Sequence, residues 1–345
     1  MLIANATGCS SIYGANLPTT PYTTNKAGRG PAWANSLFED NAEFGLGMKL
    51  ALSKKQEIAV DLLKSLESKI GSTLVNDILN NAETNETLKE LKLNQIDELN
   101  GILNTIDTYD AKKLRNLSEY LRKKDVWIFG GDGWAYDIGF GGLDHVIANN
   151  QDINILVLDT EVYSNTGGQS SKSAPTGSIA KFTASGKDGK KKDLGAIAMS
   201  YGHVYVAQIS HGASQAQVMK AISEAEAYPG PSLILAYSPC IAHAIKGGLT
   251  NSGNQAKLAT ECGYWPTYRF DPRLEAEGKN PFKIDSKQPN WDRYQEFLMN
   301  EARYAQLLDI NPDHAEELYA LNLSEAKRRY GMYKRYAAMD YSIEE

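Results

Sequence analysis

The stretch VWIFGGDGWAYDIGFGGLDHVIANNQDINILVLDT, residues 126–160, decides the fold class of this protein. It begins with a short apolar run at 126–129, passes through a glycine-rich turn into a helix-like segment that ends near Asn149, and closes with nearly continuous apolar sequence at 153–158. A strand, a helix and a second strand that is apolar on both faces are typical of a parallel sheet covered on both sides. We therefore predict an α/β fold with a doubly wound, mostly parallel sheet.

The sequence after this stretch repeats the alternation. Apolar runs at 204–209 and 233–237 predict two further strands, and the segment 214–227 between them has helical character and stops at Tyr228-Pro229-Gly230. The segment 163–193 lacks periodicity and is rich in Ser, Gly, Thr and Lys. Loops of this length inside compact domains are usually functional, so we expect it to contribute to a site.

Changes in pattern along the chain predict three parts. Apolar residues at helical spacing begin near residue 53, and Pro, charged and aromatic residues become frequent after residue 270. We predict an α/β domain formed by residues 1–52 and 116–270, a helical insertion at 53–115, and a C-terminal helical arm at 271–345.

Composition excludes several classes of protein. The 345 residues are 42% hydrophobic and 23% charged, and the mean hydropathy is -0.41, as expected for a globular protein. A net charge of -6 argues against a nucleic-acid partner, and the run Lys190-Lys191-Lys192 predicts only a solvated face. No apolar stretch approaches the ~20 residues of a membrane span, and Met1–Asn5 is too short for a signal peptide, so we expect a cytoplasmic protein without a membrane partner.

Polar residues follow the two strands of the quoted stretch. Gly131-Asp132-Gly133 comes after the first strand and Thr160 after the second, and the carboxyl edge of a parallel sheet is where ligands bind. The carboxylate of Asp132, the hydroxyl of Thr160 and the carbonyl of Val162 are hard oxygen ligands of the kind Mg²⁺ prefers, and the glycines permit close approach of a diphosphate. Taken alone, Gly-Asp-Gly also marks ordinary turns.

The glycine motif, together with DTEVYSNTGGQ at 159–169, resembles the thiamine-diphosphate motif of pyruvate:ferredoxin oxidoreductases. The resemblance implies that Asp132, Thr160 and the main-chain carbonyl of Val162 hold the magnesium ion of thiamine diphosphate. It also implies that Asn165 lies beside the thiazolium ring, where the 2-oxoacid reacts. Thr160 stands where other thiamine enzymes have Asn, which favours this family over decarboxylases and transketolases.

Three cysteines, Cys9, Cys240 and Cys262, do not predict a disulfide framework. Each alone is typical of a buried thiol. The resemblance implies that Cys9 and Cys240 supply two of the four thiolates of a 4Fe-4S cluster, the others coming from an upstream Cys-x-x-Cys that this sequence does not contain. We therefore expect the chain to be incomplete, and Cys262 to be a packed thiol.

None of the five histidines has zinc-ligand spacing with another histidine or with a cysteine pair. His145 is expected to pack its helix, and His211 either contacts the cofactor or is structural. His243 follows Cys240 by three residues and either tunes the cluster through a hydrogen bond or is structural.

The resemblance implies oxidative decarboxylation of pyruvate with coenzyme A to acetyl-CoA and CO₂, with electrons leaving through iron-sulfur clusters to ferredoxin or flavodoxin. In that family a separate N-terminal domain and a ferredoxin-like domain complete a homodimeric enzyme, so this chain is expected to be inactive by itself. Two alternatives are a subunit of another 2-oxoacid:ferredoxin oxidoreductase and an inactive thiamine-diphosphate-binding remnant. Motifs of serine hydrolases and P-loop ATPases are absent from the sequence.

Overall fold

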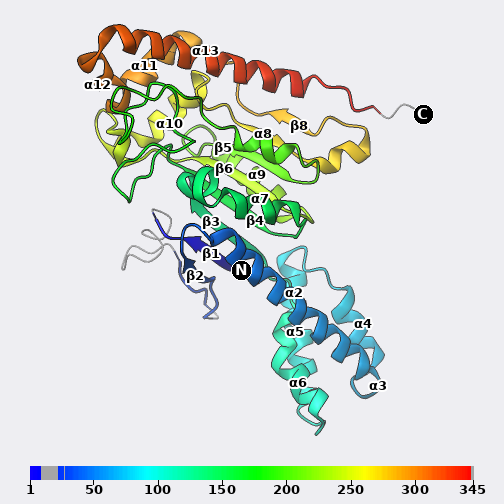
Figure 1. Ribbon diagram of the computed structural model, residues 1–345. Coiled ribbons are helices and arrows are strands. Elements are labelled where there is room, and N and C mark those ends of the chain that lie inside the picture. The colour runs from blue at the N-terminus through cyan, green and yellow to red at the C-terminus, as the bar shows by residue number, and fades with distance from the viewer. Residues whose placement is uncertain (9–21, 27, 343–345) are drawn as a thin grey trace. The chain divides into compact units, whose positions relative to one another are not determined.

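The computed structural model describes residues 1–8, 22–26 and 28–342 (Figure 1). The chain divides into two compact units, the first formed by residues 1–2 and 46–126 and the second by 3–45 and 127–345. The three-part division predicted from the sequence remains a prediction.

The first unit is helical. Its elements are most of α2 (Asn41–Ser65), α3 (Glu67–Ile70), α4 (Ser72–Asn80), α5 (Glu86–Leu103) and α6 (Tyr109–Leu117). Leu63, Ile78 and Leu99 are fully buried in its core. The side chains of Asn85 and Thr108 accept hydrogen bonds from backbone N–H groups in the first turns of α5 and α6, and these caps define where the two helices begin.

A mixed sheet forms the centre of the second unit. Among the described residues it has eight strands in the order β2-β1-β3-β4-β6-β5-β7-β8. Their bounds are β1 (Leu2–Ala6), β2 (Ala32–Ser36), β3 (Val126–Gly131), β4 (Asn154–Asp159), β5 (Tyr205–Ile209), β6 (Ser232–Tyr237), β7 (Tyr268–Phe270) and β8 (Phe282–Ile284).

The four central strands are parallel, as the apolar runs predicted. Strand β4 pairs with β3 on one side and β6 on the other, so that Asn154 lies opposite both Trp127 and Ser232. Strand β5 pairs in parallel with β6, whereas β7 and β8 continue the sheet antiparallel. The carboxyl ends of β3, β4 and β6 therefore meet at one edge.

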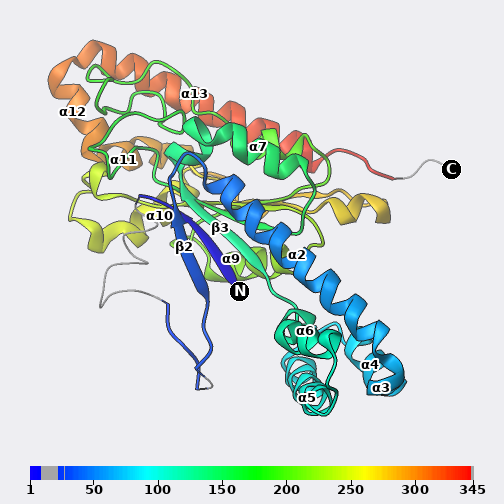
Figure 2. The ribbon, with the colours of Figure 1, turned by 60° about the horizontal axis from the view of Figure 1, so that its bottom comes forward.

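Helices cover both faces of the parallel strands. Helix α9 (Gln215–Glu226) buries Ala221 and Ala225 in one cluster with Tyr205, Ala207 and Ile234 of the sheet. Figures 1 and 2 show α7 (Phe140–Ala148) and α9 on opposite faces. This arrangement confirms the doubly wound α/β fold.

Helix α8 (Leu194–Met199) packs on the face opposite α9. A Cβ atom at Gly195 would lie 3.4 Å from the side chain of Leu235 and only 2.0 Å from the hydroxyl of Tyr268. Leu235 alternates with Ile234 along β6 and so points to the other face. Only glycine permits so close an approach of the helix to the sheet.

The C-terminal helices pack on the second unit. They are α10 (Ser252–Glu261), α11 (Tyr294–Met299), α12 (Ala302–Ile310) and α13 (Pro312–Ala337). Tyr333 of α13 contacts Tyr268 and Phe282, with ring centroids 4.9 and 5.8 Å apart, and Asn322 donates to the carbonyl of Thr176 at 2.6 Å. Helix α13 therefore fixes the long loop after β4. In the described part of the chain, no helix combines the length and apolarity that crossing a membrane requires.

Candidate functional site

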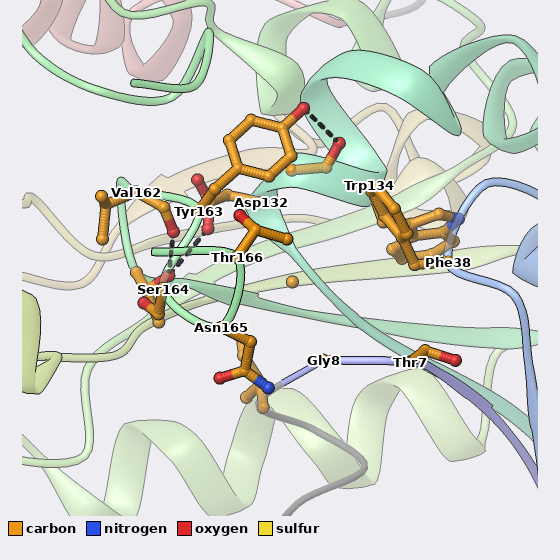
Figure 3. Close-up of a pocket in the computed structure, with 14 residues that line it drawn as sticks. Thr7, Gly8, Phe38, Asp132, Trp134, Val162, Tyr163, Ser164, Asn165 and Thr166 are labelled. Atoms are coloured by element: carbon orange, nitrogen blue, oxygen red, sulfur yellow. Dashed lines mark hydrogen bonds between the residues drawn. The ribbon is translucent and has the colours of Figure 1, made fainter. Parts of the chain in front are cut away.

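A pocket opens where strands β3 and β4 end. It is lined by the glycine motif 131–133 and the segment 162–166, together with Thr7, Gly8 and Phe38 and also Trp134, Leu158 and Thr160. Figure 3 shows Asp132, Val162 and Trp134 around it, and Asn165 directed away from Asp132 toward the Thr7–Gly8 segment. The structure thus brings together the residues that the sequence placed at the carboxyl edge of the sheet.

Three oxygen atoms form a compact group at this pocket. The hydroxyl oxygen of Thr160 lies 2.8 Å from Oδ1 of Asp132 and 3.0 Å from the carbonyl oxygen of Val162. Neighbouring ligands of an octahedral Mg²⁺ with bonds of about 2.0–2.1 Å lie about 2.9 Å apart. The spacing of these oxygens therefore fits one metal ion.

The number of protein ligands also suits magnesium. The described residues include no group of three or more His, Cys, Asp or Glu side chains that could hold a metal. A cation at Asp132 would therefore have one carboxylate, one hydroxyl and one carbonyl. Mg²⁺ is usually held by one or two carboxylates and by phosphate and water oxygens, for which this set leaves room.

The glycines of the motif differ in what they permit. A Cβ atom at Gly131 would meet nothing nearer than a backbone oxygen at 3.9 Å, so the space beside it is open for a ligand. At Gly133 a Cβ atom would come within 2.3 Å of the ring of Tyr163, whose hydroxyl donates to the Gly133 carbonyl at 3.2 Å. Gly133 thus lets the turn after β4 pack against the turn after β3.

Asp132 is buried, with 1% of its surface exposed. Burial, and then the nearby charge of Asp159, raise its pKa to about 7, although hydrogen bonds from Ser171 and Thr160 oppose this rise. Without a cation the carboxyl therefore holds a proton part of the time near neutral pH. A dication would favour the ionised form because it supplies the missing positive charge.

Lys191 pairs with two buried carboxylates, those of Asp159 and Glu161. Its ammonium lies 2.8 Å from Asp159 and 2.9 Å from Glu161, and its side chain is 12% exposed. The ring of Trp265 covers it at 4.8 Å from the centroid. The solvated face predicted for the three consecutive lysines is therefore wrong for Lys191, because buried carboxylates attract it inward.

Glu161 is held by several groups at once. Its Oε2 atom lies 2.7 Å from Arg303 and accepts from the hydroxyl of Tyr264 at 2.5 Å. Burial by itself raises the pKa of Glu161, but the charges of Lys191 and Arg303 outweigh burial and bring it to about 2. Arg303 also pairs with Glu301 at 2.6 Å. The carboxylate of Glu161 is therefore ionised at neutral pH.

His243 links the turn after β6 to the turn after β4. Its Nε2 atom lies 2.6 Å from the carbonyl oxygen of Thr160, and its Nδ1 atom accepts from the N–H of Cys240 at 3.4 Å. Since Nδ1 accepts, we assign the proton to Nε2, which then donates to Thr160. Burial, and then the charge of Arg303, lower the pKa of His243, which keeps the ring neutral. Of the two roles expected for His243, the structure shows this structural contact.

The cysteines occupy different surroundings. Cys240 is buried, and its sulfur lies 2.8 Å from the hydroxyl oxygen of Ser164. Cys262 is fully buried where α10 ends, and burial raises its pKa to about 12, which agrees with a packed thiol. Cys9 lies outside the described residues, so its predicted place beside Cys240 stays a prediction.

The remaining histidine predictions concern residues away from the pocket. His145 and His211 are exposed, and neither lines the pocket. His145 lies on α7 with its ring 3.1 Å from the side-chain nitrogen of Asn149. The contact that we considered between His211 and a cofactor has no support in the pocket described here.

Sequence reasoning missed several residues that support the site. Ser171, Lys191 and Arg303 stand far from the motif along the chain, and Arg303 is separated from Glu161 by 142 positions. Of the residues that support the site, only Asp159 could have been found from the sequence, because it stands at the end of an apolar strand. The others are recognisable as parts of the site only once the long loop and α12 are folded.

Comparison with known proteins now assigns the class. Residues 112–236, which include β3 to β5, most of β6 and the turns that follow β3 and β4, match the family "Thiamine pyrophosphate enzyme, C-terminal TPP binding domain". The chain is 51% identical over 349 residues to pyruvate:ferredoxin oxidoreductase of Moorella thermoacetica, with 98% of this chain covered. It is 52% identical over 344 residues to pyruvate-flavodoxin oxidoreductase of Trichormus variabilis, with 99% covered.

Most of the residues that match this family, 127–236, lie in the second unit. Over nearly its whole length the chain is similar to pyruvate:ferredoxin and pyruvate-flavodoxin oxidoreductases. It spans 29% of the length of each of these two relatives. A solved 2-oxoglutarate:ferredoxin oxidoreductase from Magnetococcus marinus is similar over 34% of this chain and 41% of its own, at 26% identity and a TM-score of 0.32.

Proposed function

We propose that this chain binds thiamine diphosphate with Mg²⁺ and takes part in the oxidative decarboxylation of pyruvate with coenzyme A, passing electrons through iron-sulfur clusters to ferredoxin or flavodoxin. The observation that supports cofactor binding best is the oxygen group of Asp132, Thr160 and Val162, spaced at 2.8 and 3.0 Å beside the open space at Gly131. The reaction follows the names of the relatives, which are pyruvate oxidoreductases.

Each residue of the pocket has a distinct role in this proposal. Asp132, the hydroxyl of Thr160 and the carbonyl of Val162 would hold the metal, and Gly131 would leave room for the diphosphate. Thiamine diphosphate, when bound, supplies the carbanion chemistry that decarboxylation of a 2-oxoacid requires. Asn165 lines the same pocket and would present its amide to the reacting group.

The apolar residues of the pocket exclude water from the reacting group. Phe38, Trp134 and Leu158 line it together with the polar residues, and Trp134 is buried. Fewer water molecules make the charges of the metal and of Asp132 more effective, because water screens electrostatic interactions. The pocket therefore combines an oxygen-rich wall for the diphosphate with an apolar wall for the organic part of the cofactor.

Electron transfer requires parts that this chain does not supply among its described residues. Cys240 lies next to Ser164, which directly precedes Asn165, so a cluster bound there would be close to the pocket. The thiol of Cys240 alone does not form a 4Fe-4S site, and Cys9 with an upstream Cys-x-x-Cys would complete it. The same proposal includes an N-terminal domain and a ferredoxin-like domain, and a homodimer of the full enzyme. It also includes a lack of activity in this chain alone and a cytoplasmic location.

Calorimetry tests cofactor binding directly. Thiamine diphosphate should bind the chain in the presence of Mg²⁺, and Asp132→Ala should abolish this binding because a hard cation between phosphates loses its carboxylate. Unchanged affinity in the variant would remove Asp132 from the site. Substrate identity would follow from viologen reduction by the complete enzyme with pyruvate and other 2-oxoacids.

A further inference from the structure

The metal turn, residues 160–162, contributes two of the three grouped oxygens and has two further polar groups bound by neighbouring residues. The N–H of Glu161 donates to Oδ1 of Asp159 at 3.1 Å, and the carbonyl at the start of the turn accepts from His243 at 2.6 Å. The hydroxyl of Thr160 and the last carbonyl of the turn remain directed at the oxygen group. The turn therefore has one conformation in which all of these contacts are made.

The middle residue of the metal turn adopts a backbone conformation that favours glycine. Glu161 has φ of 58°, in the left-handed region that residues with a side chain rarely occupy. Such a conformation persists only where the surroundings hold it. In this conformation the Glu161 side chain contacts Lys191 and Arg303, while the hydroxyl of Thr160 and the carbonyl of Val162 lie 3.0 Å apart.

The surroundings that hold this conformation are the partners of the Glu161 carboxylate. Lys191 lies 2.9 Å from one carboxylate oxygen, and Arg303 and the hydroxyl of Tyr264 lie 2.7 and 2.5 Å from the other. The residue is 2% exposed, so little water competes for these contacts. A buried carboxylate bound by two cations and a hydroxyl cannot rotate away without losing these three partners, which would leave its own charge buried and unpaired.

We propose that Glu161 is a positioning residue for the metal: its buried carboxylate, anchored by Lys191 and Arg303, keeps the turn in the left-handed conformation that presents Thr160 and Val162 to one cation. Glu161 contributes no oxygen to the metal itself. The inference rests on the proposed function, because it assumes that the metal turn binds Mg²⁺ with thiamine diphosphate.

The test compares Glu161→Gln with the matched control Glu301→Gln in the full chain. Glu301 is the other buried carboxylate paired with Arg303, at 2.6 Å, so both variants remove one negative charge from the same cation. Mn²⁺ serves as the probe with thiamine diphosphate at saturation, and electron paramagnetic resonance measures both Mn²⁺ affinity and the symmetry of its ligands. Circular dichroism and tryptophan fluorescence establish that each variant is folded.

We expect Glu161→Gln to weaken Mn²⁺ binding by about tenfold or more and to broaden its spectrum, as changes behind metal ligands commonly do. Glu301→Gln should stay within about twofold of the wild type, a change too small to indicate a lost positioning contact. If the wild type binds no Mn²⁺ with thiamine diphosphate, the proposed function fails. If it binds and Glu161→Gln matches it in affinity and spectrum, or if Glu301→Gln weakens binding as much, the positioning role is overturned.

A milder variant keeps the test decisive if Glu161→Gln does not fold. Tyr264→Phe removes only the hydroxyl that donates to Glu161 and leaves both cations in place. The loss of the hydrogen bond to Glu161, together with the contacts of the same hydroxyl with Arg303 and Tyr304, should weaken Mn²⁺ binding roughly threefold. An affinity equal to that of the wild type would overturn the inference.

Discussion

Replacing Asp132 with Asn should stabilise the cofactor-free chain at pH 8 and also prevent its stabilisation by Mg²⁺ and thiamine diphosphate. Asp132 has its pKa raised from 3.8 to about 7, first by burial and then by Asp159. Well below pH 3.8 the carboxyl is neutral in the folded and the unfolded chain, and its ionisation costs nothing. As the pH rises through 3.8 toward 7, the unfolded chain ionises first, so folding loses stability.

The size of this effect follows from the two pKa values. A rise from 3.8 to about 7 costs the folded state about 2 kcal/mol at pH 5 and about 4 kcal/mol at pH 8. An Asn side chain has no such cost, and it fits the site because the hydroxyls of Thr160 and Ser171 can accept as well as donate hydrogen bonds. The stability advantage of Asp132→Asn should therefore be larger at pH 8 than at pH 5, by about 2 kcal/mol.

Urea unfolding followed by tryptophan fluorescence measures this difference in the free energy of unfolding, and it reports on the second unit of the chain. All five tryptophans lie within the second unit, which contains Asp132, and they are Trp33, Trp127, Trp134, Trp265 and Trp291. Mg²⁺ and thiamine diphosphate at about 100 times their dissociation constant should stabilise the wild type by about 2.7 kcal/mol and the variant hardly at all. A variant that gains no stability between pH 5 and pH 8 relative to the wild type, or that is stabilised equally by the ligands, would refute the reasoning.

Two further predictions concern Asn165 and Cys262. Asn165→Ala should lower kcat of the complete enzyme while thiamine diphosphate still binds, because its amide is proposed to act on the reacting group; lost cofactor affinity with normal turnover per bound cofactor would contradict this. Cys262 should resist iodoacetamide in the native chain at pH 8 and react in urea, since burial raises its pKa to about 12. Rapid alkylation of the native chain, detected by mass spectrometry, would show that the thiol is accessible.

Sequence patterns predicted the parallel core of the fold because its signals are local. The apolar runs at 126–129 and 153–158 lie mostly within β3 and β4, whose residues are apolar because both faces are covered. Strands β7 and β8 have three residues each, and their sequences show no pattern that distinguishes them from loops. Strand β7 pairs with β5, and Ala207 of β5 lies opposite Arg269. This is a contact between segments that are distant in the sequence, and local periodicity does not predict such contacts.

The same distinction applies to the candidate site. Asp132, Thr160 and Val162 were predicted because each directly follows a strand or its turn, and the structure brings their oxygens together. Lys191 was expected in solvent, since a run of three lysines is usually exposed. Its burial depends on Asp159 and on a long loop whose path the sequence pattern does not determine. The charged residues that support the site through tertiary contacts are therefore the part of the site that a single sequence does not predict.

The most direct test of the account is a crystal structure of the chain with Mg²⁺ and thiamine diphosphate. The account predicts a metal ion about 2.0–2.1 Å from the carboxylate of Asp132, the hydroxyl of Thr160 and the carbonyl of Val162, with the diphosphate completing its ligands beside Gly131. A diphosphate bound elsewhere, or a metal held by other residues of the chain, would contradict it.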